Sequence, residues 1–167
     1  MRILLGGIYY YVVRDWRGRV KARGKVHNAV TTAGMNYLLD TGIRNTAQVT
    51  AWYLSIIDNA SFTAVAAADT MGSHTGWVEQ STNYSEATRP QWSPAAASAG
   101  LLSNAAAVVF TIATANFSAK GMFCTSVNTK GGTTGTLLST AILTGTQALV
   151  VTDTWELTYQ LEAQAVA

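Results

Sequence analysis

The chain has 167 residues, of which 12% are charged and 49% hydrophobic, and its formal net charge is +2. This length suits one compact domain whose core needs no disulfide or metal to hold it. The single cysteine, Cys124, excludes an intrachain disulfide and a cysteine-based zinc cage, and no apolar run is long enough to span a membrane. The charged fraction is about half the usual one, which favours a surface that is buried against other copies of the chain. The alternative is a soluble surface coated with Ser and Thr.

The first segment predicts a strand hairpin. Residues 7–14 are rich in aromatic and β-branched types, residues 14–18 read as a turn, and residues 19–27 form the partner strand. The apolar start lacks a small-residue cleavage site, so we interpret it as a strand of the mature protein rather than as a signal peptide.

A stripe of cations distinguishes the second of these strands. Residues 1–25 carry seven basic groups and one acid, a net of +6, and the rest of the chain has a net of −4. Because alternate side chains share one face of a strand, the stripe predicts a basic face that contacts an acidic partner, or that protects a sheet edge from aggregation. DNA binding is not expected, since only Trp16 supplies a neighbouring aromatic ring. The five cations are Arg17, Arg19, Lys21, Arg23 and Lys25.

The hydrophobic period changes after the hairpin and predicts one short helix near residues 31–41. Thr31 or Thr32 can cap its start, and Gly42 can close its end. The apolar residues expected on one face are Val30, Met35, Leu38 and Leu39.

The remainder predicts strands and turns. We expect strands at residues 51–57, 108–112, 119–127, 136–143 and in the closing segment from Asp153, with a connection or weak edge at 94–107. The closing segment alternates cleanly, with its apolar face formed by Trp155, Leu157, Tyr159 and Leu161. Short strands at this spacing predict a mostly β, antiparallel β-sandwich or jelly roll. We expect a single domain over residues 1–167, with the basic hairpin and helix (7–42) packed on it or extending from it.

The segment from Asp69 to Trp92 concentrates the unusual side chains. We predict that it is a long connection organised by its own contacts, with Arg89 paired to Glu79 or Glu86 and the tryptophans anchored in the core. A backbone group or carboxylate is the expected partner of His74. The six residues assigned to this structural motif are Asp69, His74, Trp77, Glu79, Arg89 and Trp92.

No residue set makes a persuasive active site. The spacing of Asp69, His74 and Glu79 matches no established metal motif, Ser73 beside His74 lacks an activating context, and Glu79 with Glu86 is a weak glycosidase pair. We therefore predict no enzyme activity, no metal and no cofactor. A carbohydrate-stacking surface is a further alternative, but core packing is the favoured role of its aromatic rings. Those rings are Trp52, Trp77, Trp92 and Trp155.

Several motifs, in this order, resemble the small structural proteins of tailed-bacteriophage virions. The basic stripe departs from the family, whose corresponding strand is mixed in charge. The matching segments are YYYVVRDWRGRVKARGKVHNAVTTAGMNYLLD (9–40), WYLSIIDNASF (52–62), DTMGSHTGWVE (69–79), YSEATRPQW (84–92), TKGGTTGTLLSTA (129–141) and DTWELTY (153–159).

This resemblance implies a virion component made in the host cytoplasm. We favour a capsid decoration (cement) protein on the outside of the head. Its expected partners are the major capsid protein and copies of itself in a homotrimer, with no membrane and no nucleic acid among them. A tail or fibre component, or a carbohydrate-binding module on the host-facing surface, is the alternative.

Overall fold

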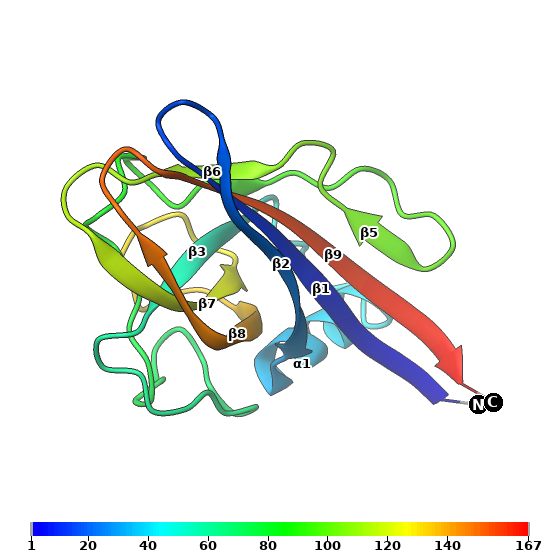
Figure 1. Ribbon diagram of the computed structural model, residues 1–167. Coiled ribbons are helices and arrows are strands. Elements are labelled where there is room, and N and C mark those ends of the chain that lie inside the picture. The colour runs from blue at the N-terminus through cyan, green and yellow to red at the C-terminus, as the bar shows by residue number, and fades with distance from the viewer. Residues whose placement is uncertain (1, 167) are drawn as a thin grey trace.

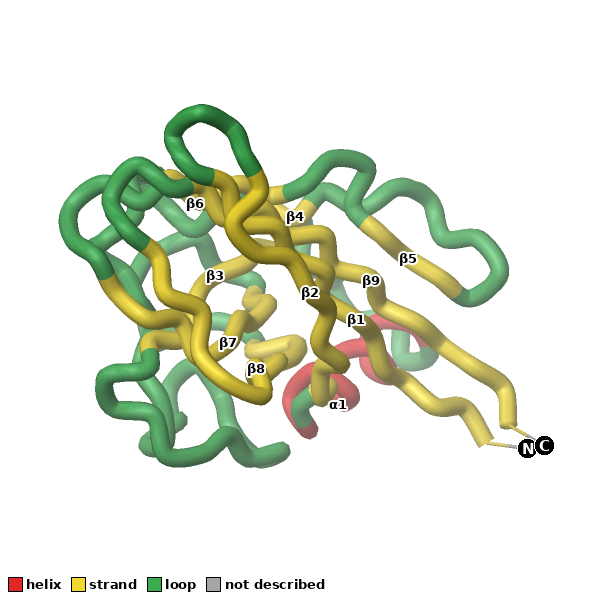
Figure 2. The backbone as a smooth tube through the Cα atoms, in the orientation of Figure 1, coloured by secondary structure: helices red, strands yellow, loops and turns green. Residues whose placement is uncertain are grey.

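The computed structural model describes residues 2–166 and has a mostly β architecture, with every strand pairing antiparallel and one short helix (Figures 1 and 2). The predicted class, an antiparallel β-sandwich or jelly roll with a short helix, is confirmed. The elements are β1 (Arg2–Arg14), β2 (Val20–Val30), α1 (Thr32–Gly42), β3 (Trp52–Asp58), β4 (Gln91–Trp92), β5 (Leu101–Ser103), β6 (Val108–Thr111), β7 (Phe117–Thr125), β8 (Leu137–Leu149) and β9 (Thr154–Val166).

The strands form one curled sheet in the order β4-β3-β7-β8-β2-β1-β9-β5, with β6 also paired to β9. Its two ends meet just after β4, where the Ala95 amide donates to the Ser103 carbonyl at 2.9 Å. The basic hairpin is therefore built into the sheet, since β1 pairs with β2 on one side and with β9 along its whole length on the other. Figure 1 shows the β1–β2 turn and the two chain termini at opposite ends of β1.

The hairpin turn alters the predicted basic face. The Asp15 carboxylate accepts hydrogen bonds from the backbone amides of Arg17 at 2.9 Å and Arg19 at 3.0 Å, and Gly18 takes a positive φ of 76°. These bonds hold the chain in a turn of the Asx type, so β2 begins only at Val20. The prediction that five cations share one strand face is thus wrong for Arg17 and Arg19.

The other three cations lie on a stretch of β2 that has a strand partner on one side alone. β2 pairs with β8 only through residues 28–30, so residues 20–27 have β1 as their one ladder partner within the described chain. Lys21, Arg23 and Lys25 are exposed along this free edge, and Lys21 falls at the register shift of the β1–β2 ladder. The structure therefore leaves both interpretations of the cations open, because a free edge is where charges deter aggregation.

Helix α1 starts and ends close to the expected positions, but its buried face differs. Thr31 is the N-cap, and its hydroxyl accepts from the Gly34 amide at 3.0 Å. Gly34 packs so closely on β8 that a Cβ there would lie 2.3 Å from the Leu138 carbonyl oxygen. This contact turns Met35 and Leu39 outward, where Leu39 is 59% exposed, so the predicted apolar face is wrong for these two residues. It is also wrong for Val30, which is the last residue of β2 and lies outside the helix.

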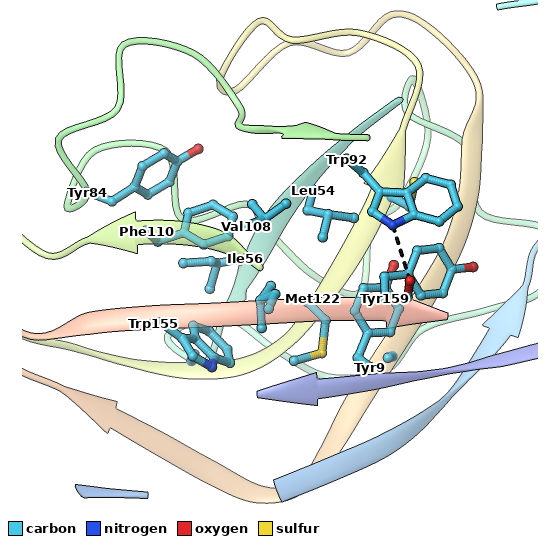
Figure 3. Close-up of a cluster of buried hydrophobic side chains, with 14 of the residues drawn as sticks. Tyr9, Leu54, Ile56, Tyr84, Trp92, Val108, Phe110, Met122, Trp155 and Tyr159 are labelled. Carbon is cyan, nitrogen blue, oxygen red and sulfur yellow. Dashed lines mark hydrogen bonds between the residues drawn. The ribbon is translucent and has the colours of Figure 1, made fainter. Parts of the chain in front are cut away.

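The core lies inside the curl of the sheet (Figure 3). The predicted inward face of β9 is confirmed, because Trp155, Leu157 and Tyr159 are fully buried. Tyr159 stacks on Tyr9 with ring centroids 4.1 Å apart, and both hydroxyls bond to Ser139. Such a satisfied polar group inside an apolar core fixes the register of the strands that carry it. Cys124 is buried, as predicted, and this burial raises the pKa of its thiol.

Candidate functional site

The segment between β3 and β4 is tied to the domain by a buried ion pair. Arg89 has no exposed side-chain surface, and its guanidinium donates to both carboxylate oxygens of Glu79 at 2.8 and 2.7 Å. The same guanidinium donates to the carbonyls of Val127 at 2.8 Å and Gly132 at 3.0 Å. The predicted Arg89–Glu79 pair is confirmed, and it links the β3–β4 connection to the β7–β8 loop. A bidentate pair with these additional acceptors is a structural strut.

Three further residues of the motif form one contact chain. The Trp77 indole donates to Asp69 at 2.9 Å, and the His74 ring stacks on Trp77 with centroids 3.9 Å apart. His74 Nδ1 lies 3.0 Å from the Trp77 carbonyl oxygen, so the expected backbone partner of this histidine is confirmed. Trp77 is 1% exposed and packs on Phe123, which makes it the centre of a second small core.

Trp92 and Glu86 act separately from these two groups. The Trp92 indole donates to the Tyr159 carbonyl and the Asn104 side chain, each at 3.2 Å, and the first bond is visible in Figure 3. Glu86 does not pair with Arg89; it accepts from the Thr111 amide at 3.0 Å. The two tryptophans of the segment are therefore core anchors, as predicted.

The arrangement does not assemble the other sites considered from the sequence. Asp69 and His74 both bond to Trp77, whereas Glu79 bonds to Arg89, and residues 2–166 hold no group of three or more His, Cys, Asp or Glu placed to bind a metal ion. The four-tryptophan carbohydrate surface is also absent from this part of the chain, because three of its members are buried and Trp52 is half-buried. Those rings pack in or against the two hydrophobic cores instead.

The second candidate site is the basic hairpin, defined here as residues 14–25. Three of its cations are neutralised: Arg14 by Glu156 at 2.8 Å, Arg19 by Asp15 at 2.7 Å and Lys21 by Asp153 at 2.6 Å. The hydrogen bond from Arg19 holds the pKa of Asp15 below its ordinary value. The remaining three have no side-chain hydrogen bond or ion pair within residues 2–166, and they are Arg17, Arg23 and Lys25.

The acidic side chains show the opposite pattern. The chain has nine Asp and Glu residues, and each accepts at least one hydrogen bond from another group of the same chain. Among the described side chains, three cations of the basic hairpin therefore lack a polar partner, whereas every carboxylate accepts at least one hydrogen bond. The unpaired cations give the basic hairpin a local positive field, whereas the chain beyond residue 25 has a net charge of −4.

From the sequence alone, Trp16 is considered only as an aromatic ring beside the cations and is assigned no binding role. It lies at the tip of the basic hairpin, where 67% of its surface is exposed, and the Arg17 guanidinium carbon lies 4.4 Å from its ring centroid. The available signal was its position inside a five-residue turn, RDWRG, because a turn side chain points away from the sheet core.

None of the helices described here is long and apolar enough to cross a membrane. Comparison with protein-family models and with curated proteins finds no match for this chain.

Proposed function

We propose that this chain is a capsid decoration (cement) protein of a tailed bacteriophage, a structural component without enzymatic activity. The resemblance in sequence motifs supplies the class of protein. The observation that carries the binding role is the charge imbalance: Arg17, Arg23 and Lys25 are free on the surface, whereas the carboxylates are bonded internally. A cationic surface of this kind attracts an anionic partner, which we propose is the outer surface of the major capsid protein.

The buried motif supports a structural rather than a catalytic role. Glu79 and Arg89 neutralise each other below the surface, and His74 is stacked on Trp77. A general acid or base must reach a substrate with a transferable proton, and these groups are already committed to the chain's own bonds.

The far end of the molecule supports self-association. Residues 2–4 of β1 and 164–166 of β9 have strand partners only in each other within the described chain. Ile3 and Leu4 are 67% and 56% exposed there. A two-stranded ribbon is marginally stable alone, so contact with the same ribbon of other copies would stabilise it. We propose a homotrimer, since a closed rotation axis buries identical surfaces and three weak contacts to a head become strong together.

Salt and charge removal test the binding role. Exposed charges are screened over about 10 Å at 0.1 M salt, so binding to heads that lack the protein should weaken as salt is added. Replacing Arg17, Arg23 and Lys25 together by Ser should weaken binding by about tenfold or more at 0.1 M salt. Arg44→Ser is the matched control, because Arg44 is an exposed arginine already paired to Asp40 on α1.

Undiminished binding of the triple variant would refute the partner role. If that variant also forms larger aggregates in sedimentation, the cations protect the free edge of β2 instead. A tail or fibre location remains the alternative within virions, and immunogold labelling of particles distinguishes it from the head.

A further inference from the structure

The tip of the basic hairpin borders a hollow of about 620 Å³. Three turns that are distant in sequence form its wall: the β1–β2 turn, the β6–β7 turn and the β8–β9 turn. The volume falls in the range of roughly 300–1,000 Å³ that is typical of binding pockets. The lining is largely apolar, and its side chains include Trp16, Ile112, Ala113 and Val151, with Thr111, Thr152 and Thr154 among them.

Two features of this tip hollow are those of an interface anchor. Trp16 is the most exposed tryptophan of the described chain, and the Arg17 guanidinium lies against its ring. Tryptophan and arginine are the residue types most enriched among side chains that dominate binding energy. When a partner covers an exposed aromatic ring at the edge of an apolar hollow, binding gains free energy because apolar surface is removed from water.

Charge restricts what can occupy the tip hollow. Asp15 is the charged residue of the lining and is paired with Arg19, whereas Arg17, which lies against the Trp16 ring, has no ion-pair partner within residues 2–166. The hydroxyls of Thr111, Thr152 and Thr154 form no side-chain hydrogen bond within residues 2–166, so they can donate to an incoming acceptor. Free donors and a free cation around an apolar floor match a segment that has carboxylates on either side of an apolar side chain.

A second copy of this chain does not meet that requirement. Its most closely spaced carboxylates, Asp153 and Glu156, flank Trp155, but Trp155 is fully buried and the Asp153 side chain is 2% exposed, so this pair does not present an exposed apolar side chain between carboxylates. The occupant is therefore a different protein with an exposed acidic segment.

We propose that the tip hollow is the anchor site for an acidic segment of the partner protein, with one apolar side chain packed against Trp16 and its flanking carboxylates on Arg17 and the threonine hydroxyls. This inference rests on the proposed function for the identity of the partner, the head exterior, but its chemistry can be tested alone.

The first experiment titrates the purified chain with three short peptides: one with a leucine between aspartates, one with a serine in its place, and one with the leucine between lysines. Iodide quenching follows mainly Trp16, because Trp77, Trp92 and Trp155 are buried and Trp52 is half-buried, and the same titration of Trp16→Phe gives the Trp52 background. The acidic leucine peptide should protect Trp16 saturably and bind about tenfold or more tightly than either control peptide. The anchor-site proposal would be overturned if the serine peptide bound as tightly as the acidic leucine peptide. It would also be overturned if the acidic leucine peptide did not protect Trp16 from iodide.

The second experiment uses variants and phage heads that lack the protein. Trp16→Ala should weaken binding to the peptide and to heads by about tenfold or more, while Trp16→Phe should stay within about threefold. Leu39→Ala is the control, because Leu39 is similarly exposed but lies on α1. Circular dichroism verifies that each variant folds.

The outcomes separate this inference from the proposed function. Heads that bind wild type and Trp16→Ala equally would overturn the anchor and leave the decoration role standing. Heads that bind no wild-type protein, while the acidic leucine peptide still protects Trp16, would overturn the decoration role alone. Protection by neutral glycans in place of the peptide would overturn the anchor in favour of carbohydrate binding.

Discussion

Replacing Arg89 by Met removes the charged centre of the buried strut and leaves Glu79 without its cation. Removing one partner of a buried ion pair costs about 3–5 kcal/mol. Glu79 keeps its bonds from Ser55 at 2.6 Å and from the Gly131 amide at 2.7 Å, which favours the lower end of that range. The carbonyls of Val127 and Gly132 also lose their donor, at about 1 kcal/mol each.

We therefore expect Arg89→Met to lower the free energy of unfolding by about 5 kcal/mol, out of roughly 5–15 kcal/mol for a domain. Urea unfolding followed by tryptophan fluorescence measures this change. The double variant Glu79→Gln/Arg89→Met should recover about half of the loss, because no unpaired carboxylate remains buried. Arg44→Met should change stability by less than about 0.5 kcal/mol, since its pair with Asp40 is exposed. A decrease below about 1 kcal/mol in the free energy of unfolding of Arg89→Met would refute the stabilising role of the Arg89–Glu79 pair.

Three other perturbations follow from the core and the helix. Trp77→Ala should lower the free energy of unfolding by about 3–5 kcal/mol in urea titrations, and near-normal stability would contradict its anchoring role. Gly34→Ala should destabilise by about 1–3 kcal/mol because its Cβ meets β8, whereas Gly42→Ala in the same helix meets nothing within 4 Å and should not; equal melting temperatures would disprove the close contact. Burial raises the pKa of three tyrosine hydroxyls above the value in the unfolded chain. Their contribution to the free energy of unfolding is therefore complete below about pH 10. Above that pH it is lost by up to about 1.4 kcal/mol per pH unit for each tyrosine. Phenolate absorbance should show these three titrating only on unfolding, and titration of all seven tyrosines in the folded chain would contradict it; the three are Tyr9, Tyr84 and Tyr159.

The sequence predicted the strands that have a clear hydrophobic period of their own. β9 alternates with period two from Thr154 to Leu161, and Trp155, Leu157 and Tyr159 turn into the core as the alternation predicts. The pairing of Arg89 with a carboxylate was also predictable, since a buried arginine needs a nearby anion, but the sequence did not decide between Glu79 and Glu86. Neither conclusion depends on contacts between distant strands.

Other features depend on contacts that a sequence pattern does not contain. The alternation of cations predicted a strand through Arg17 and Arg19, but the Asp15 carboxylate binds the turn amides and ends the ladder first. The exposed face of α1 follows from the approach of Gly34 to β8, about a hundred residues away. β2 likewise has a free edge because β8 pairs with it only through residues 28–30, and the sequence pattern does not contain this pairing.

Immunogold electron microscopy of purified virions tests the central claim most directly. An antibody against this chain should label the outside of the head at many regularly spaced positions, and particles without the protein should lose infectivity faster on heating. Label confined to the tail, or no label on intact virions, would contradict the assignment as a capsid decoration protein.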